Sequence, residues 1–316
     1  MRRIGTMTVG AALSVCALAG TAQAAARTFV SGKGADSGAC SLAAPCRSFA
    51  YAATQTNDGG ELVVLDTAGY GGLTITKSIS IVNDGAGVAS VQVPSGSAIT
   101  INAPSSAVIH LRGLTLEGAN TATDGIVFNT GGSLTVLNTL VRHFVGNGIY
   151  IQPNNVNMAF NILGVNTLDN GGRGIWVAPF NGGSAHGIVD RVTASGNFYG
   201  IVVDSVGSGL PNTVSVSNSI ISLNQFGLFS SAGNNVAQSN VFLRDSVVAQ
   251  NAQTGVGANG SNAILQLSGT TITANFNGVI TQGTVESFGN NQIHRNLIDL
   301  PTGNGNSGTL TQVSQR

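Results

Sequence analysis

The sequence has few charged residues, and lysine is almost absent among them. Asp, Glu, Lys and Arg make up 8% of the 316 residues, with 13 basic and 13 acidic side chains. No basic run occurs of the kind that attracts nucleic acids or anionic membranes, so the composition argues against both partners. Hydrophobic residues reach 42%, which argues against a disordered chain.

Long apolar runs are also missing, except at the start of the chain. Arg2 and Arg3 precede an apolar stretch over residues 4–20, and Ala22-Gln23-Ala24 has the small residues of a cleavage site. This order predicts a secretory signal peptide over residues 1–24 and a secreted protein, periplasmic or extracellular. No later stretch is apolar over the length of a bilayer, so we expect no membrane span.

Cysteine is scarce as well. Cleavage of the predicted signal peptide would leave two cysteines, Cys40 and Cys46. An even pair in an exported chain predicts a disulfide across a short loop. The alternative is a pair of buried free thiols, and no histidine lies near enough in sequence to indicate a metal site.

Residues 25–60 are predicted to form an N-terminal cap. Pro45 can open a short helix. Cys46, Phe49, Ala50 and Ala53 would then share one helical face. A solenoid needs such a cap, because its first coil otherwise exposes core residues and an unpaired strand edge.

What the sequence does contain is a short phrase that recurs along most of its length. The phrase ends in Gly followed by Ile, Val or Leu, at intervals of 23 to 28 residues. Such a period without a helical pattern indicates a solenoid. We therefore predict an all-β domain of about nine or ten coils over residues 61–298, and a loose end or a final lid over residues 299–316. The closing glycines are Gly125, Gly148, Gly174, Gly200, Gly227, Gly255 and Gly278.

Three kinds of column appear when the coils are aligned. A bend column consists mostly of Gly, Asn and Asp, which tolerate a left-handed backbone. Its members are Gly113, Asn138, Gly164, Arg191, Asn218, Asp245 and Gly269. An asparagine column predicts a ladder of amide hydrogen bonds at Asn170, Asn197, Asn224, Asn251 and Asn275. Two apolar rows, for example those containing Val136 and Ile149, are predicted to fill the interior.

The stacked phrase resembles the right-handed parallel β-helix, or pectin-lyase-like, superfamily. It is clearest at residues 197–201 and 224–228, and the resemblance covers about residues 60–298. The opening over residues 44–49 resembles uncharacterised secreted bacterial β-helix proteins. The resemblance implies a right-handed coil. In lyases of this superfamily it also implies acidic residues that bind Ca²⁺, with an Arg or Lys as base. In hydrolases it implies paired carboxylates.

Asp190 and Arg191 are the most unusual pair of charged residues. Arg191 occupies the bend column where its neighbours are Gly, Asn or Asp, and positions that break a local rule are enriched at functional sites. Arg112 and Arg244 stand in the same column as Asp190. We predict Asp190, Arg191 and Arg244 as catalytic residues for an acidic sugar, and Arg112 as a binding residue. The alternative is a solvated surface charge pair.

Tyr150 and Trp176 form the second candidate site. Each lies between inward aliphatic residues, so strand alternation points both rings outward on adjacent coils. Two such rings can make a flat platform for the apolar side of a sugar. The alternative is that they pack beneath the long loops 178–187 and 204–213.

Two functions remain open at this stage. The first is a secreted protein that binds, and in one version cleaves, an acidic polysaccharide. The second is a non-catalytic cell-surface or matrix protein used as a scaffold or adhesive surface, which the shortage of carboxylates favours. The histidines share no column and no ligand spacing, so the residues themselves indicate no metal or other cofactor, and Ca²⁺ enters by the resemblance alone. The oligomeric state is left open.

Overall fold

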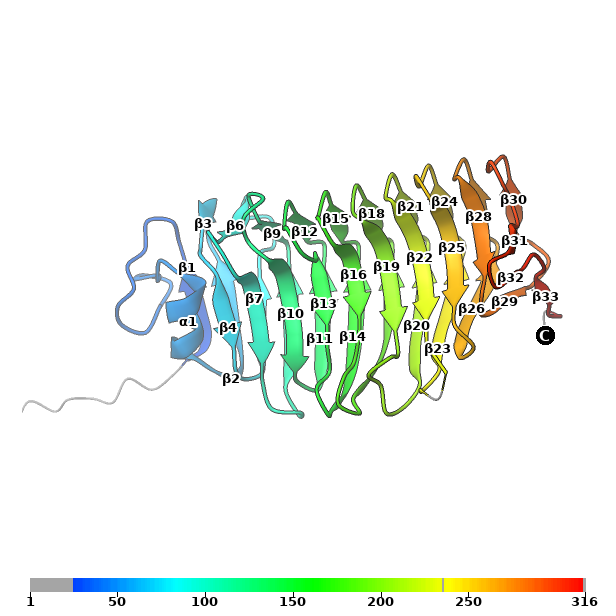
Figure 1. The fold of residues 1–316 in the computed structure, drawn as a ribbon. Helices are drawn as coiled ribbons and strands as arrows, with labels where there is room; N and C mark the ends of the chain where they lie inside the picture. The colour runs from blue at the N-terminus through cyan, green and yellow to red at the C-terminus, as the bar shows by residue number, and fades with distance from the viewer. Residues whose placement is uncertain (1–24, 235, 315–316) are drawn as a thin grey trace, which may run out of the picture.

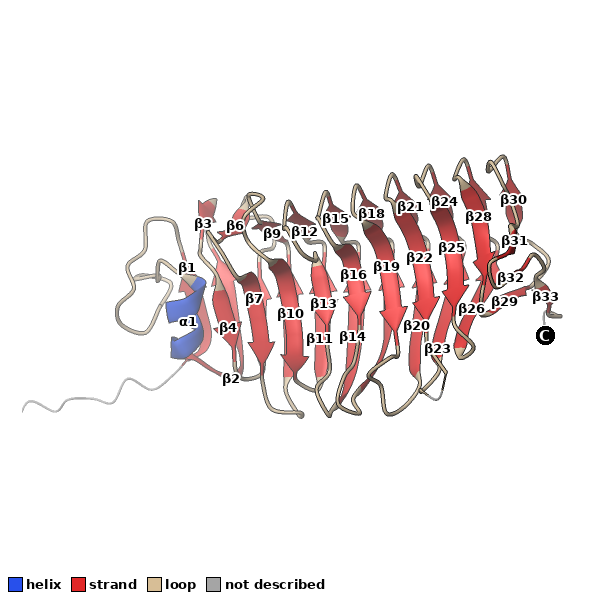
Figure 2. Ribbon diagram, viewed as in Figure 1, coloured by secondary structure: helices blue, strands red, loops and turns tan. Residues whose placement is uncertain are grey.

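The chain forms an elongated rod of stacked β coils, as the computed structural model shows for residues 25–234 and 236–314 (Figure 1). The predicted signal peptide lies outside these described residues. Each coil contributes one strand to each of three sheets, and every pairing within these sheets is parallel. Strands dominate the described chain (Figure 2). No helix in this part of the chain is long and apolar enough to span a bilayer.

The three sheets contain twelve, ten and nine of the described strands. The twelve-stranded sheet consists of β1 (Ala25–Val30), β2 (Thr56–Val64), β5 (Ile79–Val82), β8 (Val108–Arg112), β11 (Ser133–Leu137), β14 (Asn157–Leu163), β17 (Ser184–Asp190), β20 (Asn212–Ser217), β23 (Ser239–Arg244), β26 (Ala263–Ser268), β29 (Thr284–Ser287) and β33 (Thr311–Gln312). The ten-stranded sheet consists of β3 (Ala68–Gly69), β6 (Ala89–Gln92), β9 (Leu114–Glu117), β12 (Leu140–Arg142), β15 (Asn166–Leu168), β18 (Thr193–Ser195), β21 (Ile220–Ser222), β24 (Val247–Ala249), β27 (Thr271–Thr273) and β30 (Gln292–His294). The nine-stranded sheet consists of β4 (Leu73–Ile75), β7 (Ser97–Asn102), β10 (Asp124–Thr130), β13 (Ile149–Ile151), β16 (Arg173–Val177), β19 (Tyr199–Asp204), β22 (Phe226–Ser231), β25 (Thr254–Asn259) and β28 (Asn277–Thr281).

The interior of the rod is the apolar core that the two rows predicted. Each sheet buries alternate residues because successive strand side chains point to opposite faces. One row contains Leu111, Val136, Ile162, Val189, Val216, Leu243 and Leu267, and all seven are fully buried. The other contains Ile126, Ile149, Ile175, Ile201, Leu228, Val256 and Val279, which are also fully buried.

The bend column takes the left-handed backbone that its residue types predicted. All seven positions have positive φ, including Arg191 at 52°. A second left-handed column was not predicted. It lies one residue before the asparagine ladder and contains His143, Asp169, Gly196, Leu223, Gln250, Ala274 and Arg295.

The asparagine ladder runs along the turn between the ten-stranded and nine-stranded sheets. Asn224 Nδ2, for example, donates to Asn251 Oδ1 at 3.1 Å, and the backbone N–H of Asn224 donates to the same oxygen. The ladder begins where Phe144 N–H donates to Asn170. It continues one rung beyond the predicted set, to Asn296, whose Nδ2 donates to the Asp299 carboxylate at 2.8 Å.

The N-terminal cap contains a helix and the expected disulfide. Cys40 and Cys46 are bonded, so the alternative of two free thiols is wrong. Helix α1 (Phe49–Gln55) begins later than Pro45, because the Ser48 side chain accepts a hydrogen bond from Tyr51 N–H and caps it. Of the predicted face, Cys46 and Phe49 are buried and Ala53 is partly buried, whereas Ala50 is exposed and Ala52 is buried instead.

The residues after 298 continue onto the last coil. β31 (Thr302–Gly303) and β32 (Asn306–Ser307) form an antiparallel hairpin. Thr281 N–H at the end of β28 donates to Asn306 Oδ1 at 3.0 Å. β33 then pairs with β29 in the twelve-stranded sheet. The tail thereby places hydrogen-bonding groups against the final coil.

Candidate functional site

The outer face of the nine-stranded sheet carries a row of large apolar side chains. The strand register aligns Val127, Tyr150, Trp176, Val202, Phe229, Gly257 and Ile280. Three adjacent strands of this sheet, β16, β19 and β22, begin with Arg173, Tyr199 and Phe226. The register pairs Arg173 with Tyr199, and Tyr199 with Phe226. This face therefore gathers rings from successive coils, about 4.8 Å apart along the rod.

Tyr150 and Trp176 stack on each other, as their position on adjacent coils predicted. Their ring centres lie 4.3 Å apart and their planes differ by 7°. The two faces meet, so the rings do not lie side by side as the expected flat platform. Both rings are half-buried, so each keeps part of its surface exposed.

Arg173 extends this stack to the next coil. Its guanidinium carbon lies 4.1 Å from the centre of the Trp176 ring and 5.5 Å from the centre of the Tyr199 ring. Because Tyr199 belongs to the coil beyond Trp176, the guanidinium covers the face of Trp176 that Tyr150 leaves free. Such cation–π contacts hold a guanidinium in one orientation. Tyr199 in turn stacks on Phe226 at 4.7 Å.

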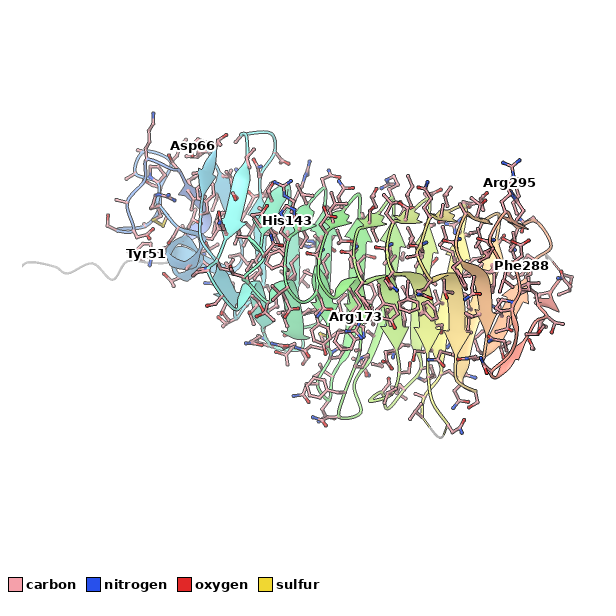
Figure 3. The ribbon with its side chains drawn as sticks, turned by 45° about the horizontal axis from the view of Figure 1, so that its top comes forward. Tyr51, Asp66, His143, Arg173, Phe288 and Arg295 are labelled. Carbon is pink, nitrogen blue, oxygen red and sulfur yellow. A yellow bond between two sulfur atoms is a disulfide. The ribbon has the colours of Figure 1, made fainter. Side chains whose placement is uncertain are left out.

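Two adjoining cavities lie on this face, and Asp204 lines both of them. The Trp176 cavity has a volume of about 330 Å³ and lies between the Tyr150–Trp176 pair and the loop residues Ala178, Pro179, Phe180, Val206 and Gly207. The Arg173 cavity has a volume of about 350 Å³ and includes Arg173, Tyr199, Phe226, Phe229, Ser231, Thr254, Asn259 and Gln282. We call the two together the groove. Arg173 lies midway along the rod in Figure 3.

Asp204 ends β19 at the junction of the two cavities. One carboxylate oxygen accepts a hydrogen bond from Val206 N–H at 2.9 Å. Burial raises the pKa of Asp204, and the effects of this hydrogen bond and of Arg173 oppose the rise only in part. Asp204 and Arg173 form no salt bridge within the described chain, and both line the Arg173 cavity.

A row of amides borders the Trp176 cavity. Asn129 Nδ2 donates to Asn102 Oδ1 at 2.8 Å, and Gln152 Nε2 donates to Asn129 Oδ1 at 2.5 Å. Gln152 lines the cavity itself. The groove therefore has aromatic rings on one strip and hydrogen-bonding amides on the next, which is the mixture that a polyhydroxylated ligand needs.

The predicted residues Asp190, Arg191 and Arg244 lie elsewhere, at the carboxyl ends of strands β17 and β23 in the twelve-stranded sheet. Arg191 pairs with Asp190 at 2.5 Å, with side-chain exposures of 66% and 14%. Hydrogen bonds from Asn218 and Ser217 also reach the Asp190 carboxylate, and the one from Asn218 contributes most to lowering its pKa. Arg244 lies 3.5 Å from Asp245.

Arg112, predicted as a binding residue, shares the register column of Asp190, as the aligned coils predicted. It ends β8 in the twelve-stranded sheet and pairs with Asp84 at 2.8 Å. Tyr150 and Trp176 belong to the nine-stranded sheet. The structure therefore places the predicted basic residues and the predicted rings on different sheets.

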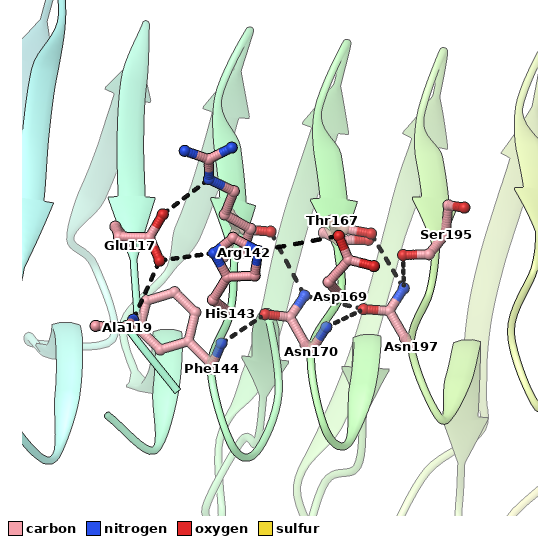
Figure 4. A network of polar contacts seen from close by, with 11 residues as sticks. Glu117, Ala119, Arg142, His143, Phe144, Thr167, Asp169, Asn170, Ser195 and Asn197 are labelled. Atoms are coloured by element: carbon pink, nitrogen blue, oxygen red, sulfur yellow. Dashed lines mark hydrogen bonds and ion pairs between the residues drawn. The ribbon is translucent and has the colours of Figure 1, made fainter. Parts of the chain in front are cut away.

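A charged cluster lies beside the first rungs of the asparagine ladder (Figure 4). Glu117 accepts hydrogen bonds from Arg142 and His143, both at 2.8 Å. Burial alone would raise the pKa of Glu117, but hydrogen bonds from His143, Ala119 N–H and Arg142 bring it below its ordinary value. His143 also approaches Asp169 at 4.0 Å. These charged groups pair with one another across three adjacent coils. We therefore interpret the cluster as a structural link between those coils.

Comparison with known proteins supports the architecture. No model of a known protein family matches the sequence, and no curated protein sequence matches it. Among solved structures, a pectate lyase, Pel9A, superposes with a TM-score of 0.62 and 16% identity, over 83% of this chain and 74% of that one. A rhamnogalacturonan lyase superposes with a TM-score of 0.54 and 11% identity, over 78% of this chain and 74% of that one. The chain has the pectin-lyase-like fold, a right-handed parallel β-helix.

The resemblance to lyases of this fold implied a calcium site. No group of three or more His, Cys, Asp or Glu side chains in residues 25–234 and 236–314 is placed to hold a metal ion. Hard cations need several oxygen ligands together. We therefore assign no step to calcium.

Sequence reasoning missed Arg173 and Asp204 as site residues of this β-helix. Both stand at strand ends, where no residue-type rule is broken. The sequence marks them only by their positions in the repeat. Arg173 directly precedes the repeat glycine Gly174, and Asp204 lies two residues after Val202 of the outward row. Only the register of the adjacent strands β16 and β19 brings them to one groove.

Proposed function

We propose that this chain is an exported protein that binds an acidic polysaccharide along the groove of its nine-stranded sheet. The observation that carries the proposal is the pair of adjoining cavities, which follow the rod axis and share Asp204. Export is supported by the Cys40–Cys46 disulfide, because disulfides persist in oxidising compartments. The solved structures with the same fold include two named as polysaccharide lyases.

The repetition of the groove supports a polymeric ligand. Each coil adds one outward position to the apolar row and one to the neighbouring polar row, so similar contacts recur along the axis. A linear polysaccharide has recurring apolar ring faces and hydroxyl groups. Arg173 supplies the positive charge that an acidic sugar requires.

The groove supports binding more strongly than cleavage. Asp204 is the one carboxylate among the residues that line its two cavities, whereas most glycoside hydrolases use a pair. Cleavage of the bound polysaccharide would therefore depend on Asp190, Arg191 and Arg244, which lie on the twelve-stranded sheet. The scaffold function would apply if no polysaccharide bound.

The test is affinity electrophoresis of the signal-free protein, with intact disulfide, against acidic and neutral polysaccharides. We expect retardation by acidic polymers and a loss of about tenfold or more in affinity for Trp176→Ala. Phe276→Ala is the matched control, because Phe276 is exposed and lines neither cavity. Equal loss in both variants, or no retardation by any polymer, would contradict the proposal. New unsaturated or reducing ends in the same samples would show cleavage.

A further inference from the structure

We infer that the two cavities of the groove select sugars by charge: the Arg173 cavity takes a carboxylate, and the Trp176 cavity takes an uncharged sugar. The ligand class is then a uronic acid polymer in which charged residues are interspersed with neutral or esterified ones. This inference rests on the proposed function and specifies its ligand.

The Trp176 cavity is poorly suited to an anion. Asp204 is the only ionisable acid or base among its lining side chains apart from the Tyr150 hydroxyl, and burial raises the pKa of that hydroxyl. Its other walls include Phe180 and Val206, which are 37% and 62% exposed. A carboxylate placed here would lose water without gaining a cation, and would be repelled by ionised Asp204.

The Arg173 cavity offers the opposite environment. Arg173 belongs to no ion pair in the described chain, and its buried Nε has no hydrogen-bond partner there. Its guanidinium carbon lies 4.1 Å from the centre of the Trp176 ring and 5.5 Å from the centre of the Tyr199 ring, and the side chain lines the cavity. Charge-assisted hydrogen bonds to a carboxylate are the strongest contacts that a guanidinium makes. Ser231, Thr254 and Asn259 supply hydroxyl and amide groups around it.

Trp176 separates the two environments. Tyr150 lies on one of its faces and Arg173 on the other, so the guanidinium is on the far side of the indole from the Tyr150 side of the groove. Asp204 lies at the junction of the two cavities. A carboxylate in the Trp176 cavity would therefore lie beside Asp204 with the indole between it and Arg173, whereas in the Arg173 cavity the guanidinium offsets the charge of Asp204.

The probe is polygalacturonan of one chain length at low, intermediate and full methyl esterification, titrated calorimetrically at pH 7. We expect the intermediate polymer to bind about tenfold more tightly than either extreme. Arg173→Met should remove the advantage over the fully esterified polymer, and Arg173→Lys should retain part of it. Asp204→Asn should bring the unesterified polymer close to the intermediate one.

Two control variants match these charge changes away from the groove. Arg295→Met removes an exposed arginine near the C-terminal end of the rod (Figure 3). Asp84→Asn removes a carboxylate that pairs with Arg112. Both should keep the wild-type order of the three polymers. Circular dichroism of each variant checks that the coils remain folded.

The failure of the inference differs from the failure of the proposed function. Equal affinity for all three polymers, or an unchanged order in Arg173→Met, overturns the inference while polysaccharide binding stands. An unchanged deficit of the unesterified polymer in Asp204→Asn also overturns it. No binding of any of the three polymers by the wild-type protein overturns the inference and leaves the proposed function to the wider panel.

Discussion

The guanidinium of Arg173 lies over the indole ring of Trp176, with 4.1 Å between the guanidinium carbon and the ring centre. Trp176 is the only tryptophan in the chain. Its emission therefore reports on the groove without interference from a second indole.

We predict that saturating polygalacturonan of intermediate esterification shifts the Trp176 emission to shorter wavelength. The half-buried indole loses water contact when a sugar covers its exposed part. A fluorescence titration gives the affinity, which should agree with the calorimetric value. Arg295→Met should show the same shift. An equal shift with polyethylene glycol at the same concentration would mean that the signal does not report sugar binding.

Asn224→Ala should lower the free energy of unfolding by about 3 kcal/mol, because it leaves buried polar groups without partners. Asn224 Nδ2 donates to Ala194 O at 3.0 Å as well as to Asn251, and its Oδ1 accepts from Asn197. Urea denaturation followed by circular dichroism measures the change. Asn166→Ala is the control, since Asn166 is exposed at the start of β15. A loss of the same size in both would mean that the ladder is not the cause.

The ladder shows how far a sequence pattern can reach. Asparagines at one position in successive coils have few other ways to satisfy buried amides, so their spacing predicted the hydrogen bonds correctly. Asn296 was missed because the coil that contains it is short, 21 residues from Asn275. The left-handed column before the ladder was missed because Leu223 and Ala274 have no intrinsic preference for positive φ. The ladder turn imposes that backbone on them.

The groove was harder to predict than the fold. Core rows and bends follow from one residue type repeated in each coil, whereas a binding site is a departure from the repeat. Sequence reasoning found one such departure at Arg191, where a bend residue is unusual. Arg173 replaces no conspicuous type, and its relation to Asp204 depends on the pairing of β16 with β19. The roles of Asp190, Arg191 and Arg244 stay predictions.

Reduction of the Cys40–Cys46 bond should lower stability by about 2 kcal/mol, since the bond closes a short loop and restricts the unfolded chain. The effect should be greatest in the cap, which covers the first coils. Hydrogen exchange with and without a reductant would locate it in residues 25–64. A Cys40→Ala, Cys46→Ala variant should be insensitive to the reductant. Uniform acceleration of exchange along the whole rod would contradict this local effect.

Acid should weaken the N-terminal cap through Asp66. The Gly32 N–H contributes most to lowering the pKa of Asp66 to about 2, with further hydrogen bonds from Ser31 and Tyr70. An unfolded Asp has a pKa of about 3.9. Because the folded value is the lower one, Asp66 stabilises the fold above about pH 4, and this contribution is lost as the pH falls to about 2.

Asp66→Asn should therefore be less stable than wild type at pH 7, and its urea midpoint should fall less between pH 4 and pH 2. Asp84→Asn is the control, because Asp84 is more than half exposed and makes a surface ion pair. Urea midpoints of the three proteins at pH 7, 4, 3 and 2 measure the difference. If the midpoint of Asp66→Asn fell as steeply as that of wild type, the acid sensitivity would have to come from other carboxylates, and Asp66 would be a polar contact whose charge contributes nothing.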